Sequence, residues 1–152
     1  MKKDLTLYIL MRNDLASMNA GRCMAQASHA SNAFIHKFGK DKLVKEWQNQ
    51  TNQGFGTAIV LSANEHQIRA TDIKLEESDV FNFRDYLIDP EYSYIVEGEF
   101  INLIDKNKHV LDPVLKSDGK WIAWRKEMTC FYAFGDRNDT VFKEQFSGLN
   151  LF

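Results

Sequence analysis

Residues 5–30 have the sequence LTLYILMRNDLASMNAGRCMAQASHA, and they decide the fold that we predict for this chain. The first seven residues form an unbroken apolar and β-branched run, which is typical of a strand buried on both faces and therefore central in a sheet. The next three, Arg-Asn-Asp, end this strand. From residue 19 to about residue 38 the spacing of Ala, Met, Gln and Ser indicates a helix, with Asn19 or Ser17 as its N-cap.

The two sides of this predicted helix differ in chemistry. At about 100° per residue, one side carries a polar line and the other carries small and apolar residues. The polar line is Arg22, Gln26, His29 and His36, and the opposite side holds Ala20, Met24, Ala27, Ser31 and Phe34. We expect the second side to lie on the sheet. A polar stripe is most often a solvated face, so the pattern alone assigns no function.

The rest of the chain alternates strand and helix signals. We predict strands at 57–61, 92–96 and 129–134. Helices are predicted from Asp41 over a short apolar side, from Ser78 to just before Pro90, and at about 139–146, with a helical turn after a capping-box pattern of Ser62 and Glu65. Residues 98–126 allow no assignment beyond a turn near 117–119. The alternation indicates an α/β protein, and 152 residues suit a single domain over 1–152.

Composition excludes several classes of protein. The formal net charge of −2 lacks the positive field of a dedicated duplex binder, so any nucleic-acid contact must come from a local patch. No apolar run approaches the length that spans a bilayer, and no secretory segment is visible. We therefore expect a cytoplasmic protein with no membrane partner. In that compartment we expect Cys23 and Cys130 to be free thiols. Neither cysteine has a partner at metal-ligand spacing, and the four histidines form no HxxxH pair; we therefore expect no metal site.

Three motifs resemble a known family. Arg12-Asn13-Asp14-Leu15, Met18, Gly21-Arg22 and residues 25–30 (AQASHA) are similar in order and type to the signature of the type-2, archaeal and eukaryotic class of peptidyl-tRNA hydrolases. Residues 129–135 (TCFYAFG) resemble the closing strand of that family, and residues 148–152 (GLNLF) resemble its terminus.

The resemblance implies a four-stranded, mostly parallel or mixed sheet covered by helices, and hydrolysis of the ester that joins a peptide to the 3′ end of tRNA, without a cofactor. Such a reaction needs a nucleophilic water, a group that takes its proton, and donors aimed at the oxyanion. The resemblance assigns these roles to Arg22, Gln26, His29, Glu97 and Thr129: Arg22 stabilises charge, Glu97 or a neighbour orients water, and Gln26 and Thr129 place the substrate. His29 has a structural alternative, and Thr129 could be an ordinary strand opener.

The sequence departs from the family at three places. Arg22 stands where the family has lysine, which keeps the charge near a helix N-terminus but cannot relay a proton near neutral pH. The aspartate of a D-A-G turn has no clear counterpart, and Glu97 is the nearest carboxylate. Residues 99–126 exceed the short loop usual in the family, so we expect an insertion there. Its Trp121 and Trp124, flanked by Lys120, Arg125 and Lys126, are predicted to bind tRNA by stacking and charge, with packing as the alternative.

A second class of function competes with hydrolysis. The lysine-to-arginine change, the missing aspartate turn and the acidic net charge also suit a non-catalytic descendant that keeps the fold and binds RNA, a peptide or a protein. The sequence leaves open whether the chain is a monomer or a homodimer.

Overall fold

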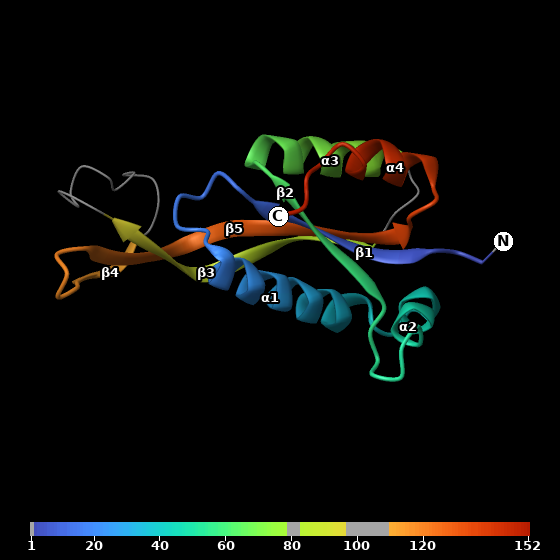
Figure 1. Ribbon diagram of the computed structural model, residues 1–152, viewed down its shortest axis with the longest axis horizontal. Coiled ribbons are helices and arrows are strands. Elements are labelled where there is room, and N and C mark those ends of the chain that lie inside the picture. The colour runs from blue at the N-terminus through green and yellow to red at the C-terminus, as the bar shows by residue number, and fades with distance from the viewer. Residues whose placement is uncertain (1, 79–82, 97–109) are drawn as a thin grey trace.

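The computed structural model describes residues 2–78, 83–96 and 110–152. These residues form one mixed α/β domain with a five-stranded sheet in the order β2-β1-β5-β3, in which β4 pairs with β5 off this path. The strands are β1 (Leu5–Arg12), β2 (Thr57–Ala63), β3 (Arg84–Val96), β4 (Val110–Leu115) and β5 (Trp121–Asp136). The helices are α1 (Ala20–Phe38), α2 (Lys42–Gln48), α3 (Glu65–Glu77) and α4 (Thr140–Phe146). Figure 1 shows α1 and α2 on one face of the sheet and α3 and α4 on the other.

The central position predicted for β1 is confirmed. All eight of its residues are buried, and it pairs parallel with β2 and antiparallel with β5. The α/β class is also confirmed, but the prediction of four strands is wrong by one. The additional strand, β4, comes from residues for which the sequence pattern allowed no assignment.

Two apolar cores lie on the two faces of the sheet. On the α1 side, Phe34 contacts Trp47, Tyr132 and Phe134 with ring centroids 5.1–5.9 Å apart. On the other side, Tyr8 stacks on Phe146 of α4 at 4.3 Å. Burial of such aromatic side chains is the main source of stability in a domain of this size.

The buried face of α1 differs from the predicted one. Its buried residues are Cys23, Gln26, Ala30 and Phe34, whereas Met24 is 68% exposed. Placing Gln26 on the side of α1 opposite the sheet was wrong, because its amide finds hydrogen-bond partners in the sheet, which offset the cost of burying it. The N-cap prediction is confirmed, since the Asn19 side chain accepts a hydrogen bond from the Arg22 backbone N–H.

Strand β3 replaces the helix predicted from Ser78 to Pro90. Residues 79–82 lie outside the described residues, but Arg84–Val96 is extended and pairs antiparallel with β5. Pro90 fits because β3 is an edge strand of the sheet and the pairing is irregular between Asp89 and Tyr92. The capping-box prediction was also misplaced: Asn64 and Gln67 form the box that begins α3.

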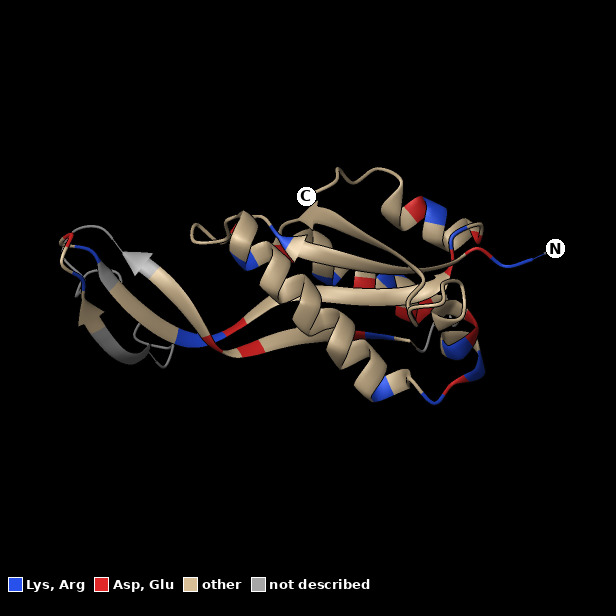
Figure 2. Ribbon diagram, turned by 60° about the horizontal axis from the view of Figure 1, so that its bottom comes forward, with Lys and Arg blue, Asp and Glu red and all other residues tan. Residues whose placement is uncertain are grey.

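Strands β3 and β5 continue beyond the helix-covered sheet as an arm, made of residues 92–96, β4 and residues 121–126 with the turn between them. Within it β5 pairs with β3 on one side and with β4 on the other. Figure 2 shows the arm reaching away from the helices. The predicted turn near 117–119 is confirmed: Lys116 N–H donates to the Lys120 carbonyl at 2.8 Å, and Gly119 has a φ of 80°. That left-handed backbone favours glycine.

In the described part of the chain, no helix has both the length and the apolar character needed to cross a membrane.

Candidate functional site

Arg22 connects the start of α1 to the root of the arm. Its Nη2 donates to the Ser93 hydroxyl at 2.9 Å, and its Nη1 donates to the Ser17 carbonyl at 2.8 Å. The guanidinium carbon also lies 5.7 Å from the centroid of the buried Tyr92 ring, within cation–π range. Two hydrogen bonds and a ring contact therefore hold the guanidinium in one orientation.

One helical turn further along α1, Gln26 makes a second bridge to β3. Its Nε2 donates to Asp89 Oδ2 at 2.6 Å, and its Oε1 accepts from the Thr129 hydroxyl at 2.7 Å. The two bonds fix the amide orientation, because a carboxylate can only accept and the amide nitrogen can only donate. Gln26 is 5% exposed and Thr129 is fully buried, so neither group has water as an alternative partner.

Thr129 reaches Gln26 because of an irregularity in the β3–β5 pairing. Leu87 pairs with Cys130 and Ile88 pairs with Met128, so Thr129 has no partner on β3. An extra residue of this kind is a β-bulge, which redirects a side chain relative to regular alternation. As a result Thr129 turns toward α1 and joins Gln26 and Asp89 in one hydrogen-bonded row.

A pocket of about 200 Å³ opens beside this row. It is lined by Gln26, His29, Leu87, Ile88, Asp89 and Pro90. His29 is exposed at its edge. The Asp89 carboxylate is held twice, since Oδ1 accepts from the Glu91 backbone N–H at 2.9 Å while Oδ2 accepts from Gln26. Gln26, which holds this carboxylate, thus lies one helical turn along α1 from Arg22.

Asp89 and Ser93 were not predicted as site residues: Asp89 falls in the segment predicted as a helix, and Ser93 falls in the strand predicted at 92–96, where no motif marks it. A signal was present: Asp-Pro favours a turn, and it follows the apolar run Tyr-Leu-Ile. Glu97, the carboxylate predicted instead, lies outside the described residues.

The predicted tRNA-binding residues lie in the arm. Trp124 is partly buried and pairs with Ser93 across the strands. Arg125 Nη2 forms an ion pair with Glu127 Oε2 at 2.9 Å, and its guanidinium carbon lies 4.2 Å from the Tyr94 ring centroid, so its charge is already paired. Lys126 is exposed. For Trp121 the backbone position in β5 is described but its side chain is not.

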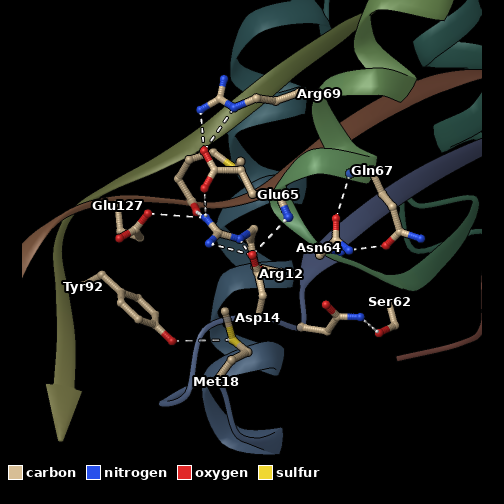
Figure 3. Close-up of polar contacts among 12 residues, drawn as sticks. Arg12, Asp14, Met18, Ser62, Asn64, Glu65, Gln67, Arg69, Tyr92 and Glu127 are labelled. Carbon is tan, nitrogen blue, oxygen red and sulfur yellow. Dashed lines mark hydrogen bonds and ion pairs between the residues drawn. The ribbon is translucent and has the colours of Figure 1, made fainter. Parts of the chain in front are cut away.

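A second polar cluster lies at the end of β1 (Figure 3). Arg12, 5% exposed, donates to both carboxylate oxygens of Asp14 at 2.5 and 3.1 Å and to the Met128 carbonyl at 3.0 Å. Its Nη1 lies 3.4 Å from both Glu65 and Glu127. Burial alone would raise the pKa of Asp14, but the bond from Arg12 lowers it overall. Because Arg12 is saturated by protein partners, this cluster ties β1 to β5 and α3.

The thiols suit neither nucleophilic catalysis nor metal binding. Burial raises the pKa of Cys130, the neighbour of Thr129, to about 12, so it stays protonated near neutral pH. Burial also raises the pKa of Cys23. Among the residues that the structure describes, no three His, Cys, Asp or Glu side chains are grouped so as to hold a metal ion.

Comparison with known proteins identifies the family. The family model for peptidyl-tRNA hydrolase PTH2 matches residues 5–84, just over half of the chain. The match covers β1 to α3 and stops at the first residue of β3, so it includes Arg22 and Gln26 but neither Asp89 nor Thr129. No match was found among curated proteins. With a family model matched over more than half of its residues, the chain belongs to the peptidyl-tRNA hydrolase PTH2 family.

Proposed function

We propose that this protein hydrolyses the ester bond of peptidyl-tRNA and releases free tRNA and a peptide. The observation that carries the proposal is the row Thr129–Gln26–Asp89, which holds a carboxylate beside a pocket, with Arg22 one helical turn from Gln26 on α1. Family membership suggests this activity, and the row lies partly outside the matched residues, so it is an independent argument.

Asp89 is the group that we assign to the nucleophilic water. Both of its oxygens already accept one hydrogen bond, and each carboxylate oxygen has a second lone pair for a further donor. A water bound there would donate to Asp89 and attack the ester carbonyl, passing its proton to the carboxylate. In this proposal Asp89 takes the role predicted for Glu97, and His29 at the pocket edge contacts the substrate.

Arg22 is the group that we assign to the developing negative charge. A guanidinium has five N–H donors, and the bonds to Ser17 and Ser93 use two of them. The remaining donors are available for the oxyanion or for a phosphate next to the ester. Because arginine stays charged, the proton needed by the departing ribose oxygen must come from another group. Protonated Asp89 can return the proton that it took from water, which balances the reaction.

Gln26 and Thr129 then act as positioning residues, since each reaches the reacting atoms only through Asp89. Trp121 and Trp124 remain predicted stacking residues. Base stacking is worth about 1–3 kcal/mol for each aromatic side chain. Replacing both with Ala should therefore weaken tRNA binding by a few kcal/mol, and unchanged affinity in a folded double variant would assign them to packing. Arg125 and Lys126 are predicted to add positive charge to that contact. Arg125 does so only after its ion pair with Glu127 breaks.

The decisive experiment is turnover of peptidyl-tRNA by the parent, Arg22→Lys, Arg22→Ala and Asp89→Asn at equal folded concentration. We expect Arg22→Lys to retain turnover, and Arg22→Ala and Asp89→Asn to lose on the order of 10²-fold or more. The matched control is Arg69→Ala on α3, an exposed arginine outside the site. An Arg22→Ala or Asp89→Asn variant as active as the control would remove that residue from the mechanism.

The non-catalytic alternative predicts a different pattern. Its support is Arg22 itself, where the family has lysine. No turnover in the parent or in Arg22→Lys, combined with tRNA binding that Arg22→Ala weakens, would establish an RNA-binding protein on this fold.

A further inference from the structure

We propose that Glu127 is a positioning residue that orients the guanidinium of Arg22, and that it acts through two tyrosine rings of β3. These rings, Tyr94 and Tyr92, connect the polar cluster at the end of β1 with the contacts around Arg22. The effect on catalysis rests on the proposed function, because the orientation of Arg22 matters for turnover only if its guanidinium binds the developing negative charge.

Glu127 is buried where three strands meet. Its side chain is 9% exposed and accepts a hydrogen bond from the Tyr94 hydroxyl of β3 at 2.5 Å. Two cations also contact it: Arg125 Nη2 of β5 lies 2.9 Å from Oε2, and Arg12 Nη1 of β1 lies 3.4 Å from Oε1 (Figure 3). A buried carboxylate is costly unless it is paired and hydrogen-bonded. Partners on three strands therefore hold this carboxylate in one place.

The Tyr94 ring is fixed by this carboxylate. Burial and the bond to Glu127 raise the pKa of Tyr94, so its hydroxyl keeps its proton and remains a donor near neutral pH. The guanidinium carbon of Arg125 lies 4.2 Å from the ring centroid, within cation–π range. The ring is thus anchored at its hydroxyl and contacted by a cation.

Tyr92 connects Tyr94 to Arg22. The two tyrosine rings are in edge contact, with centroids 5.2 Å apart and planes at 81°. Tyr92 is 2% exposed, and the guanidinium carbon of Arg22 lies 5.7 Å from its ring centroid. The Ser17 hydroxyl donates to the Tyr92 hydroxyl at 3.3 Å, and the next residue, Ser93, accepts from Arg22 Nη2. Both segments that hold Arg22 therefore contact or adjoin Tyr92, so a shift of this ring would release the guanidinium.

Stability alone does not explain this cluster. Apolar side chains of similar volume often replace a buried ion pair with no loss of stability. Among the described residues, Arg125 Nε is also buried without a hydrogen-bond partner, which is a further cost to the fold. A directional bond from Tyr94 to Glu127 does what apolar packing cannot, because it fixes the position of the hydroxyl and thereby of the ring. The cluster is better explained by the geometry that it imposes on Arg22.

The test measures the orientation of Arg22 by nitrogen NMR of its guanidinium group, identified as the signals that disappear in Arg22→Lys. The variants are Tyr94→Phe and Glu127→Gln. The matched control, Tyr86→Phe, removes from the same strand a hydroxyl that donates to Asp72 at 2.7 Å. We expect the two terminal nitrogens of Arg22 to give separate signals in the parent and the control, and merged signals in the variants, where rotation about the Cζ–Nε bond is faster.

Turnover of peptidyl-tRNA gives a second readout. Tyr94→Phe and Glu127→Gln should each lower kcat on the order of tenfold, less than the roughly 10²-fold that about 1 Å of misplacement can cost. KM should change little, because the charge that Arg22 stabilises develops only in the transition state. Tyr86→Phe should leave kcat unchanged. In an Arg22→Ala background neither substitution should lower kcat further, because the interaction that it removes acts through Arg22.

The two readouts separate this inference from the proposed function. A parent protein without turnover would refute the proposed function, while merged Arg22 signals in the variants would still support the positioning role. Separate signals in both Tyr94→Phe and Glu127→Gln, or a kcat loss fully additive with that of Arg22→Ala, would overturn the inference. If Glu127→Gln does not fold, Tyr94→Phe decides the outcome, because it removes a single hydroxyl.

Discussion

Gln26→Glu tests the row Thr129–Gln26–Asp89 with almost no change of shape. The substitution replaces the amide nitrogen that donates to Asp89 at 2.6 Å with a carboxylate oxygen, and leaves an acceptor for the Thr129 hydroxyl. Two carboxylates this close cannot both ionise freely, so one of them should titrate at a raised pKa. Two unit charges about 4 Å apart repel by roughly 1 kcal/mol in water and by roughly 4 kcal/mol in partly buried surroundings. The larger value applies at position 26, because Gln26 is only 5% exposed.

The sign of the pH dependence follows from that repulsion. Between the carboxyl pKa of the unfolded chain and the raised pKa of the folded pair, the folded variant holds a proton that the unfolded chain has lost. The free energy of unfolding is therefore highest at low pH and falls as pH rises through this interval. Turnover should fall on the order of 10²-fold on both sides of the transition. At low pH the shared proton blocks Asp89 as a base, and at high pH repulsion displaces it.

Denaturant unfolding at pH 5 and pH 8, together with turnover at both pH values, measures these effects. The control is Gln67→Glu, the same chemical change at an exposed position in the first turn of α3, where an acidic residue is favourable. Parent-like turnover in Gln26→Glu, or a stability difference between the two variants that is the same at pH 5 and pH 8, would refute the role assigned to this row.

Arg12→Met should cost about 3 kcal/mol, or roughly 6–12 °C in Tm, because it leaves the buried Met128 carbonyl without its donor and removes the cation that Asp14, Glu65 and Glu127 share. Arg69→Met, at an arginine 55% exposed, should cost under about 0.5 kcal/mol. Equal losses would contradict the structural role of the Arg12 cluster. Burial and the bond to Asp72 raise the pKa of Tyr86 to about 12. The free energy of unfolding should therefore fall as pH rises from about 10 to about 12, and this fall should be less steep in Tyr86→Phe. An alkaline unfolding curve unaffected by that substitution would show that Tyr86 does not titrate there. Turnover of peptidyl-tRNA should be unchanged by a chelator. Turnover that is lost with the chelator and recovered on adding zinc would instead support a metal mechanism.

The sequence predicted those elements whose periodicity reflects burial directly. The β1 run is apolar at nearly every position because both faces of the strand are covered, and the α1 N-cap is a local interaction. The segment around β3 was harder, because its aromatic spacing also fits a helix and Pro90 resembles a helix end. Pairing with β5 decides the conformation of this strand, and such pairing is a tertiary effect that no local pattern contains.

The candidate site was predictable to the extent that it follows a family motif. Arg22, Gln26 and Thr129 came from the resemblance, whereas Asp89 became visible only as the partner of Gln26, 63 residues away in sequence. Helical projection placed Gln26 on the side of α1 facing away from the sheet for the same reason. Its burial depends on an acceptor from β3 and a donor from a bulge in β5, and both come from distant parts of the chain.

The arginine at position 22 is better explained by its anchoring than by its charge alone. An ammonium is a compact charge at the end of a flexible stem, whereas a guanidinium can be held at two atoms and still present further donors. Arg22 is held in this way by Ser17 and Ser93, with Tyr92 beneath it. This anchoring would reduce the entropy lost if an anion binds. A guanidinium stays protonated near neutral pH, so this residue does not donate the proton of the departing oxygen. A hydrolase built on Arg22 therefore requires a carboxylate that takes a proton and returns it, which makes the hydrolysis hypothesis depend on Asp89 as strictly as on the arginine.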